Sequence, residues 1–239
     1  MKQDFQAIWV YLATTPLLGL TVTLIAYQVG TWIHERLGRN PLLNPVLFAV
    51  VAIVLTLKLT GTAYGTYFDG AQFVHFLLGP ATVALAVPLY RQLSVLRRSW
   101  ASIIAAVVAG SLTAAVTAVG FAWALGASRE TLMSLAPKSV TTPIAMGIAE
   151  QIGGLPSLTA VLVILTGILG AAFGTWILDR IRVGSPAARG LALGVASHGI
   201  GTARALQESE VTGAFSGLAM GLNGLATALL LPLLVALLS

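Results

Sequence analysis

The chain has 239 residues, of which 57% are hydrophobic and only 9% are charged; its mean hydropathy is +0.91. Soluble domains carry about 25% charged residues, so this composition excludes a soluble globular protein and indicates one integral membrane domain over residues 1–239. The net charge of +5 comes largely from arginines at the ends of apolar segments, which favours cytoplasmic loops over nucleic-acid binding.

Five apolar segments are long enough to cross a bilayer, which takes about 20 residues. They cover residues 7–30, 42–60, 100–125, 158–178 and 212–238. The first is interpreted as an uncleaved membrane helix, because no small-residue cleavage pattern follows a short apolar core. Three further apolar segments are interrupted, at residues 71–90, 136–154 and 187–206. The predicted fold is therefore an all-α membrane bundle with discontinuous segments.

Residues 136–154 read APKSVTTPIAMGIAEQIGG and cannot form one continuous helix. Pro137 and Pro143 each remove a backbone donor, and two glycines loosen the far end. Polar, broken backbone at membrane depth is tolerated only where it is packed in protein or lines a wet cavity. This segment is therefore the first candidate for a binding site.

The arginine-rich connections at residues 91–98 and 179–189 are expected on the cytoplasmic side of the membrane. The helix of residues 100–125 then ends outside, and the helix of residues 158–178 begins outside. Residues 136–154 must enter and leave on that same side, with arms too short to span a bilayer. We therefore predict a re-entrant hairpin that enters from the outside.

An internal repeat is visible at an offset of 57 residues. It matches Leu78, Pro80, Val83, Gly110, Leu112, Ala114 and Ala115 with Leu135, Pro137, Val140, Gly167, Leu169, Ala171 and Ala172. By this repeat, residues 71–90 form a second hairpin, which enters from the cytoplasm, and residues 77–88 face the first. Such opposed segments are typical of inverted-repeat transporters. If residues 71–90 instead simply cross the membrane, Arg36 and Arg39 lie inside, as the charge rule prefers, and the inversion is lost.

Four stretches of the chain resemble the LrgB/CidB family of bacterial membrane proteins, most closely its YohK-type members. They are PLLNPVLFAV (residues 41–50), LLGPATVALAVPLY (residues 77–90), APKSVTTPIAM (residues 136–146) and ARGLALGVASHGIGTARA (residues 188–205). PKSVTTPIA and ASHGIGTAR are long and unusual strings, so the match is specific. The likeness runs through nearly the whole chain, from about Trp9 to the C-terminus.

This resemblance implies two kinds of function. The older family description is antiholin-like: with a small LrgA-type partner, the protein modulates murein hydrolase activity and cell lysis. The plastidal glycolate/glycerate translocator fuses an LrgA-like half to an LrgB-like half, and this chain resembles its C-terminal half. Bacterial pairs have been linked to pyruvate and related small monocarboxylates. We expect a multi-pass protein of the bacterial inner membrane, surrounded by lipid bilayer, that forms a homo-oligomer (a dimer) and binds no nucleic acid.

Lys138 is the strongest single candidate for binding an anion. An ammonium within the membrane costs from about 2.5 kcal/mol upward unless it is compensated, and a carboxylate would compensate it. Ser139, Thr141 and Thr142 can donate hydrogen bonds, and the main chain from Val140 onward opens a short helix whose positive end favours anions. Alternatively, Lys138 extends to the outer interface and the hydroxyls only satisfy the broken backbone.

Other candidates come from the repeat partner and from the third interrupted segment. Pro80 and Thr82 would form a second helix start at the same site. Ser197 and His198 interrupt residues 187–206, and His198 could couple proton movement to anion transport or simply pack in the bundle. Arg204 could bind the carboxylate in bidentate fashion or pair with nearby glutamates.

Glu150, near the end of the predicted hairpin, could carry a proton or lie at the surface. Three scattered histidines and no cysteine argue against a metal site, and no phosphate-binding loop or catalytic triad is present, so we expect no cofactor and no enzyme. The sequence predicts a proton-coupled transporter of glycolate, glycerate, lactate or pyruvate. The alternatives are an antiholin-like or holin-like regulator and a structural scaffold.

Overall fold

The computed structural model describes residues 16–38, 45–77, 80, 84 and 86–238, and the regular structure in these ranges is helical. Four of the helices are long and apolar enough to cross a membrane, which confirms the predicted all-α membrane fold. The chain packs as two compact units, residues 1–84 and 85–239. The expectation of a single domain stays a prediction.

The described residues of the first unit form three helices, of which the first packs against the other two. They are α2 (Pro16–Arg36), α3 (Pro45–Thr60) and α4 (Tyr64–Phe76). Gly30 of α2 lies against α3 so closely that a Cβ there would be 2.6 Å from the Pro45 carbonyl oxygen. A hydrogen bond of 2.8 Å between the hydroxyls of Thr23 and Tyr67 joins α2 to α4. Helix α3 ends where the sequence predicted, whereas α2 continues six residues beyond the predicted end.

The second unit contains one short connecting helix and the six helices that build the site. They are α6 (Ala86–Arg91), α7 (Leu93–Ala124), α8 (Arg129–Leu135), α9 (Thr142–Ile152), α10 (Pro156–Arg180), α11 (Pro186–Glu208) and α12 (Glu210–Leu238). The spans predicted at residues 158–178 and 212–238 agree with α10 and α12 within two residues. Helix α7 begins seven residues earlier than predicted and includes Arg97 and Arg98, because arginine is a good helix former and no glycine or proline breaks that stretch.

The helix starts in this unit follow signals that the sequence carries. The Ser128 hydroxyl accepts a hydrogen bond of 3.3 Å from the Thr131 N–H at the start of α8. Proline occupies the first turn of α9, α10 and α11, where its missing N–H costs nothing. Gly153 ends α9 with φ 84°, a left-handed conformation that glycine adopts without strain.

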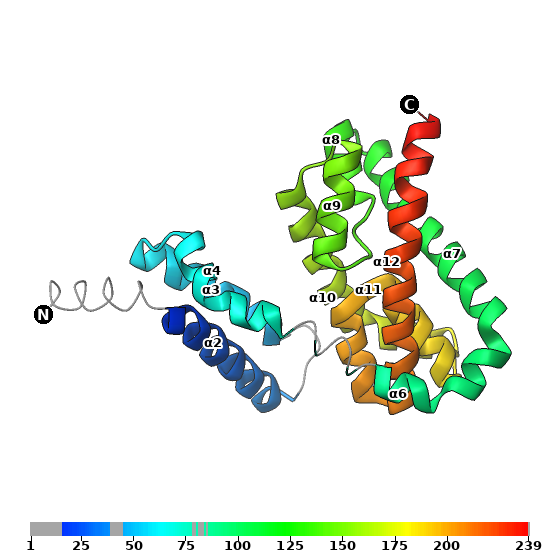
Figure 1. The fold of residues 1–239 in the computed structure, drawn as a ribbon, viewed down its shortest axis with the longest axis horizontal. Coiled ribbons are helices and arrows are strands. Elements are labelled where there is room, and N and C mark those ends of the chain that lie inside the picture. The colour runs from blue at the N-terminus through cyan, green and yellow to red at the C-terminus, as the bar shows by residue number, and fades with distance from the viewer. Residues whose placement is uncertain (1–15, 39–44, 78–79, 81–83, 85, 239) are drawn as a thin grey trace, which may run out of the picture. The chain divides into compact units, whose positions relative to one another are not determined.

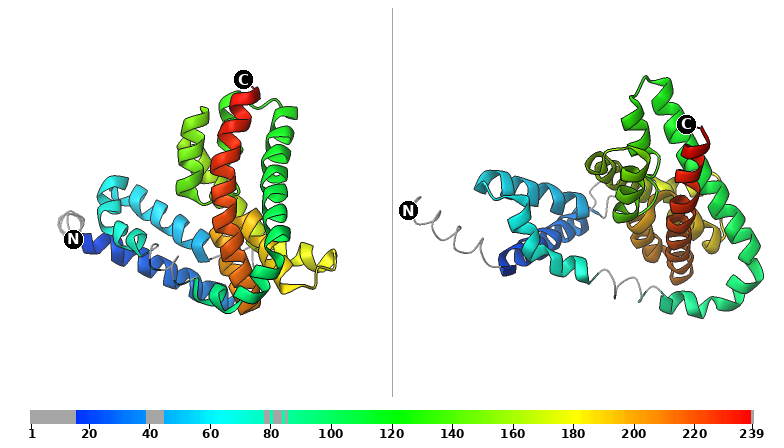
Figure 2. Two further views of the ribbon diagram at one scale, coloured as in Figure 1. Left: turned by 45° about the vertical axis from the view of Figure 1, so that its right-hand side comes forward. Right: turned by 45° about the horizontal axis from the view of Figure 1, so that its top comes forward.

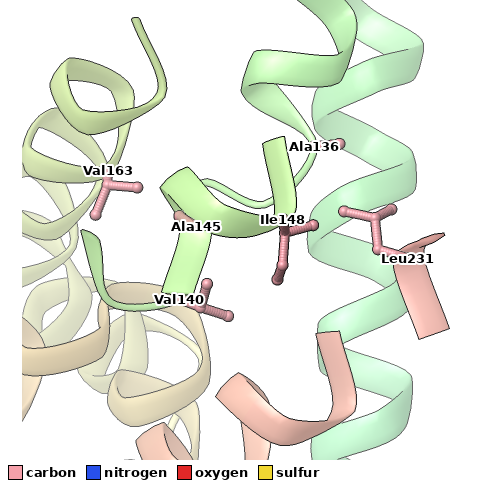
Figure 3. Close-up of a cluster of buried hydrophobic side chains, with 6 residues drawn as sticks. All are labelled: Ala136, Val140, Ala145, Ile148, Val163 and Leu231. Atoms are coloured by element: carbon pink, nitrogen blue, oxygen red, sulfur yellow. The ribbon is translucent and has the colours of Figure 1, made fainter. Parts of the chain in front are cut away.

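Helices α8 and α9 form a hairpin whose two ends lie together. The Leu155 N–H donates to the Ser134 hydroxyl at 2.8 Å, and the Thr159 hydroxyl of α10 donates to the Ser134 carbonyl at 3.0 Å. The chain thus leaves and returns at the same end of α10, as predicted for residues 136–154. Figure 3 shows the core of this hairpin, in which Val140 and Ile148 pack with α10 and α12.

Helix α11 is a second hairpin, because it reverses direction at His198, where the backbone has φ 41° and ψ −132°. Arg189 near its start forms an ion pair of 2.9 Å with Glu208 at its end, although a straight helix would place these residues about 28 Å apart. Gly201 lies against the first arm, where a Cβ would be 2.6 Å from the Leu193 carbonyl oxygen. The sequence marked this segment as interrupted but did not predict the reversal.

The two hairpins enter the second unit from opposite ends. Near the start of α12, a Cβ on Gly190 of α11 would overlap the Thr212 main chain. Near the other end of α12, Leu231 packs with Ala136 of the first hairpin. Figures 1 and 2 show the same arrangement, with the C-terminus at the end where α8 lies and α11 at the opposite end. We call α8 with α9 the outer hairpin and α11 the inner hairpin, after the predicted topology.

A helix followed by a hairpin therefore occurs twice, as α7 with the outer hairpin and α10 with the inner hairpin. An offset of 57 residues relates Gly110 of α7 to Gly167 of α10, and it relates Thr141 in the outer turn to His198 in the inner turn. The repeat in the sequence thus has a structural counterpart within the second unit. There the segment that faces the outer hairpin is α11. That residues 77–88 face the outer hairpin stays a prediction, because part of that range lies outside the described residues.

Candidate functional site

The turns of the two hairpins meet at Asn223 of α12. Its side-chain nitrogen Nδ2 donates to the carbonyl of Ser139 at 3.1 Å and to the carbonyl of Val195 at 3.1 Å. Ser139 lies in the turn before α9. A continuous helix would pair the Val195 carbonyl with the N–H of residue 199, beyond the break at His198. One amide therefore binds a carbonyl from each broken segment and ties both hairpins to α12.

This meeting point lies near the middle of the long helices. Asn223 is the fourteenth of the 29 residues of α12, and His198 packs against Gly167, the twelfth of the 25 residues of α10. Trp100 and Trp123 of α7 are exposed, and exposed tryptophans are typical of membrane interfaces. They are separated by a rise of about 34 Å, close to the thickness of the hydrocarbon core. The turns therefore lie near mid-membrane depth.

Lys138 brings a positive charge to this point. Its side chain is half-buried, and its Nζ lies 3.5 Å from the Ser139 hydroxyl. Lys138 precedes Ser139 in the outer turn, and His198 lies in the inner turn, and Asn223 joins these two turns through the carbonyls of Ser139 and Val195. Among the described residues, none of the ion pairs involves Lys138. An anion is the partner that would compensate this ammonium.

Two helix starts reach the same region, because each hairpin turns there and its second arm leads away. Helix α9 begins after Thr141, whose side chain makes no capping hydrogen bond, and the second arm of α11 begins after His198. The first N–H groups of a helix lack partners within it and form its positive end. Thr141 and Thr142 are half-buried. The Val140 N–H is already used, since it donates to the Pro137 carbonyl at 3.2 Å.

Ser197 and His198 lie in the turn of the inner hairpin and are buried, with exposed fractions of 1% and 5%. His198 Nε2 lies 2.9 Å from the Val163 carbonyl oxygen, which can only accept, so Nε2 carries the proton. Glycines on α10 make room for the turn: a Cβ on Gly167 would be 2.7 Å from the imidazole, and one on Gly170 would overlap the Ser197 hydroxyl. The Ser197 hydroxyl has no partner among the described residues.

Two other predicted site residues of the second unit, Arg204 and Glu150, lie outside this cluster. Arg204 is six residues beyond His198 and donates to the Gln207 side chain at 3.0 Å, while its Nε is buried without a partner in the described part of the chain. Glu150 is exposed on α9. Pro80 is exposed in the first unit, and Thr82 lies outside the described residues. The residues brought together at the meeting point are Lys138, Ser139, Val140, Thr141, Thr142, Ser197, His198 and Asn223.

Asn223 is the residue that the sequence analysis missed. It occurs in the apolar segment of residues 212–238, and an amide at that depth needs partners within the protein. This signal was available in the sequence. What the sequence did not indicate is that the partners are main-chain carbonyls from two separate hairpins.

An ion-pair network closes the base of the inner hairpin at the arginine-rich end, and its central pair, Arg189 with Glu208, lies outside the four candidate spans. Arg189 donates to both carboxylate oxygens of Glu208, at 2.9 and 3.1 Å, and to Asp179 at 2.7 Å. The Thr175 hydroxyl donates to Glu208 at 2.7 Å. Hydrogen bonding by Arg189 lowers the pKa of Glu208, and hydrogen bonding by Glu208 raises the pKa of Arg189. The network ties both arms of α11 to the end of α10.

The model of the LrgB-like family matches residues 23–237 of the chain, a range that includes both hairpins. The chain belongs to the LrgB family. The family also includes proteins named antiholin-like protein LrgB: the one from Bacillus mycoides (strain KBAB4) is 36% identical over 219 residues, which cover 92% of this chain and 95% of the relative. Those from Bacillus cereus (strain B4264) and Bacillus anthracis (strain CDC 684 / NRRL 3495) are 35% identical over 219 residues, which again cover 92% of this chain and 95% of each relative. No solved structure matches the chain.

Proposed function

We propose that this LrgB-family protein is a transporter, or a transporter subunit, for small monocarboxylates such as glycolate, glycerate, lactate or pyruvate. The observation that carries the proposal is the position of Lys138, which lies with two helix starts where two opposed hairpins meet. Its ammonium and the positive helix ends suit a carboxylate. Opposed broken segments around one site are the arrangement that alternating access uses in inverted-repeat transporters.

His198 is the residue proposed to couple transport to protons. Its Nε2 already donates to Val163, so an incoming proton would bind Nδ1. The resulting imidazolium would lie beside the charge of Lys138, and two cations at one buried place are unfavourable. A bound carboxylate removes that penalty, so anion and proton would each favour the binding of the other.

The proposed setting is the inner membrane of a bacterium. Arginine-rich ends are retained in the cytoplasm, which would direct the inner hairpin to enter from the cytoplasm and the outer hairpin from outside. An LrgA-type small membrane protein and a second copy of the chain are the proposed protein partners.

A second candidate is an antiholin-like regulator of murein hydrolase activity and cell lysis. The name of the relatives, antiholin-like protein LrgB, supports this candidate more directly than it supports transport. Such a protein would act by assembly with its partner and would need no saturable site. The two candidates therefore differ in what a purified protein does in a membrane.

The test is uptake of radiolabelled glycolate, lactate and pyruvate into proteoliposomes, with an inward proton gradient. We expect saturable uptake by the parent and a loss of at least about tenfold in Lys138→Ala, since the variant lacks the charge that pairs with the carboxylate. Lys58→Ala is the matched control, because Lys58 is exposed at the end of α3 and should leave uptake unchanged.

Each other outcome of this experiment has a distinct meaning. Unchanged uptake in Lys138→Ala removes Lys138 from the site, and no uptake by the parent ends the proposal that the chain transports alone. Leakage of an unrelated entrapped dye would indicate a pore and favour the holin-like reading. Hydrolase release in cells without any flux would favour the antiholin-like regulator.

A further inference from the structure

The hydrogen bonds around Asn223 decide which way its amide points. Nδ2 carries two N–H groups, and the carbonyls of Ser139 and Val195 accept from it at 3.1 Å each. Rotating the amide by half a turn would place its oxygen against those two carbonyl oxygens, where nothing donates. The atom that remains is therefore the amide oxygen, Oδ1.

Oδ1 of Asn223 is buried and has no hydrogen-bond partner among the described residues, and the whole side chain is 0% exposed. Burying an unpaired amide oxygen is unfavourable, and a lipid core supplies no donor. Thr227, about one turn further along the same helix, is also buried, yet its hydroxyl bonds to Ser111 at 2.9 Å. One buried polar side chain of α12 is therefore satisfied within the protein, whereas Oδ1 of Asn223 is not.

The Asn223 amide and the Lys138 ammonium both contact Ser139. Asn223 binds the Ser139 carbonyl, and Lys138 Nζ lies 3.5 Å from the Ser139 hydroxyl. These groups require different partners: Lys138 needs a negative group, and Oδ1 needs a donor. A carboxylate with a hydroxyl group a bond or two away satisfies both. An ammonium donor fits less well, because it would lie near the cation.

We propose that Asn223 is a specificity-determining residue, whose Oδ1 accepts a hydrogen bond from a hydroxyl group of the bound anion. The inference rests on the proposed anion site at Lys138. A site that hydrogen-bonds a substrate hydroxyl rejects the analogue without it, because its own buried group is then left unpaired. Lactate should therefore bind more tightly than propionate, which has the same carbon skeleton, and more tightly than pyruvate, which has only acceptors in place of the hydroxyl.

The test measures binding of lactate and propionate to the purified full chain in detergent by isothermal titration calorimetry. We expect the parent to bind lactate at least about tenfold more tightly than propionate. Asn223→Ala should bind the two acids equally, since Lys138 still attracts either carboxylate. Thr227→Ala is the matched control, because Thr227 is buried in the same helix and contacts neither hairpin turn through its hydroxyl; it should keep the preference of the parent.

A second measurement needs no variant and so does not depend on whether Asn223→Ala folds. 2-Methoxypropionate keeps the oxygen of lactate but lacks its O–H, so the parent should bind it no better than propionate. Binding of the methoxy acid as tight as that of lactate, or a preference that persists in Asn223→Ala, overturns the inference. A parent that binds lactate and propionate equally overturns this inference alone. A parent that binds none of the acids overturns the proposed function with it.

Discussion

His198 donates from Nε2 to the main-chain carbonyl of Val163, 2.9 Å away, and so holds the turn of the inner hairpin against the middle of α10. The same residue has φ 41° and ψ −132° inside what would otherwise be one helix. Such a backbone conformation costs a residue with a side chain about 1–3 kcal/mol. Strain of this kind persists only where the surroundings enforce it, and here it lies where the two hairpins meet.

Gly167→Ala should separate the inner turn from α10. The added Cβ would lie 2.7 Å from the His198 imidazole, so the turn must shift, and we expect a loss of about 1–3 kcal/mol together with weaker anion binding. Gly147→Ala is the control, because nothing lies within 4 Å of a Cβ built on that helical glycine. Thermal unfolding in detergent measures both variants, and equal melting temperatures would contradict the close contact.

Replacing His198 by glycine or alanine separates backbone strain from side-chain contacts. Both variants lose the bond to Val163, but only glycine adopts a positive φ without cost. His198→Gly should therefore be more stable than His198→Ala, by about 1 kcal/mol or more. In a regular helix the order is reversed, because alanine is favoured over glycine by about 1 kcal/mol. Denaturation of the two variants shows which has the larger free energy of unfolding. If His198→Ala is the more stable variant, α11 does not reverse at this residue.

The contrast between the two hairpins explains how far the fold could be predicted. In the outer hairpin, Pro137 and Pro143 forbid a continuous helix, so the break can be predicted from the local sequence alone. The inner hairpin has no proline at its turn. Its reversal depends on contacts between distant residues, such as those of His198 with Val163 and of Arg189 with Glu208. Contacts of that kind leave no local pattern in a single sequence.

In the candidate site, too, some residues could be predicted from the sequence, whereas the role of others depends on contacts between distant parts of the chain. Lys138 and His198 were predicted from their residue types, and the structure places them in the two hairpin turns that Asn223 joins. Arg204 was predicted either to bind the carboxylate or to pair with nearby glutamates. A helix rises about 1.5 Å per residue, so the six residues after His198 place Arg204 about 9 Å along the helix from the turn. Asn223 was missed because its role depends on two hairpins meeting, which the sequence does not state.

The Arg189 to Glu208 pair should make stability depend on pH. Its hydrogen bond lowers the pKa of Glu208 below 4.5, so the stabilisation is complete above that pH and is lost as the pH falls through the lowered pKa. Glu208→Gln should lose about 1.5–3 kcal/mol at neutral pH and show a weaker loss of stability on acidification than the parent. Melting temperatures at pH 7 and below pH 4 provide the comparison.

The neighbouring glutamate is the control for that prediction. Glu210 forms an ion pair of 2.8 Å with Arg91, but the two side chains are 51% and 65% exposed. Exposed pairs contribute about 0–1 kcal/mol, so Glu210→Gln should behave nearly like the parent at both pH values. A loss as large as that of Glu208→Gln would show that the effect comes from general surface charge and not from the base of the inner hairpin.

The opposed entry of the two hairpins can be tested with single cysteines, because the chain has none of its own. Glu130 is exposed at the base of the outer hairpin, and Gly184 is exposed in open space before α11. If the arginine-rich end faces the cytoplasm, a membrane-impermeant maleimide should label Glu130→Cys in intact cells and Gly184→Cys only after the cells are opened. Labelling of both from one side would contradict the opposed hairpins. An exchange of the two sides would keep the hairpins opposed but reverse the orientation, and Lys138 would then belong to the hairpin that enters from the cytoplasm.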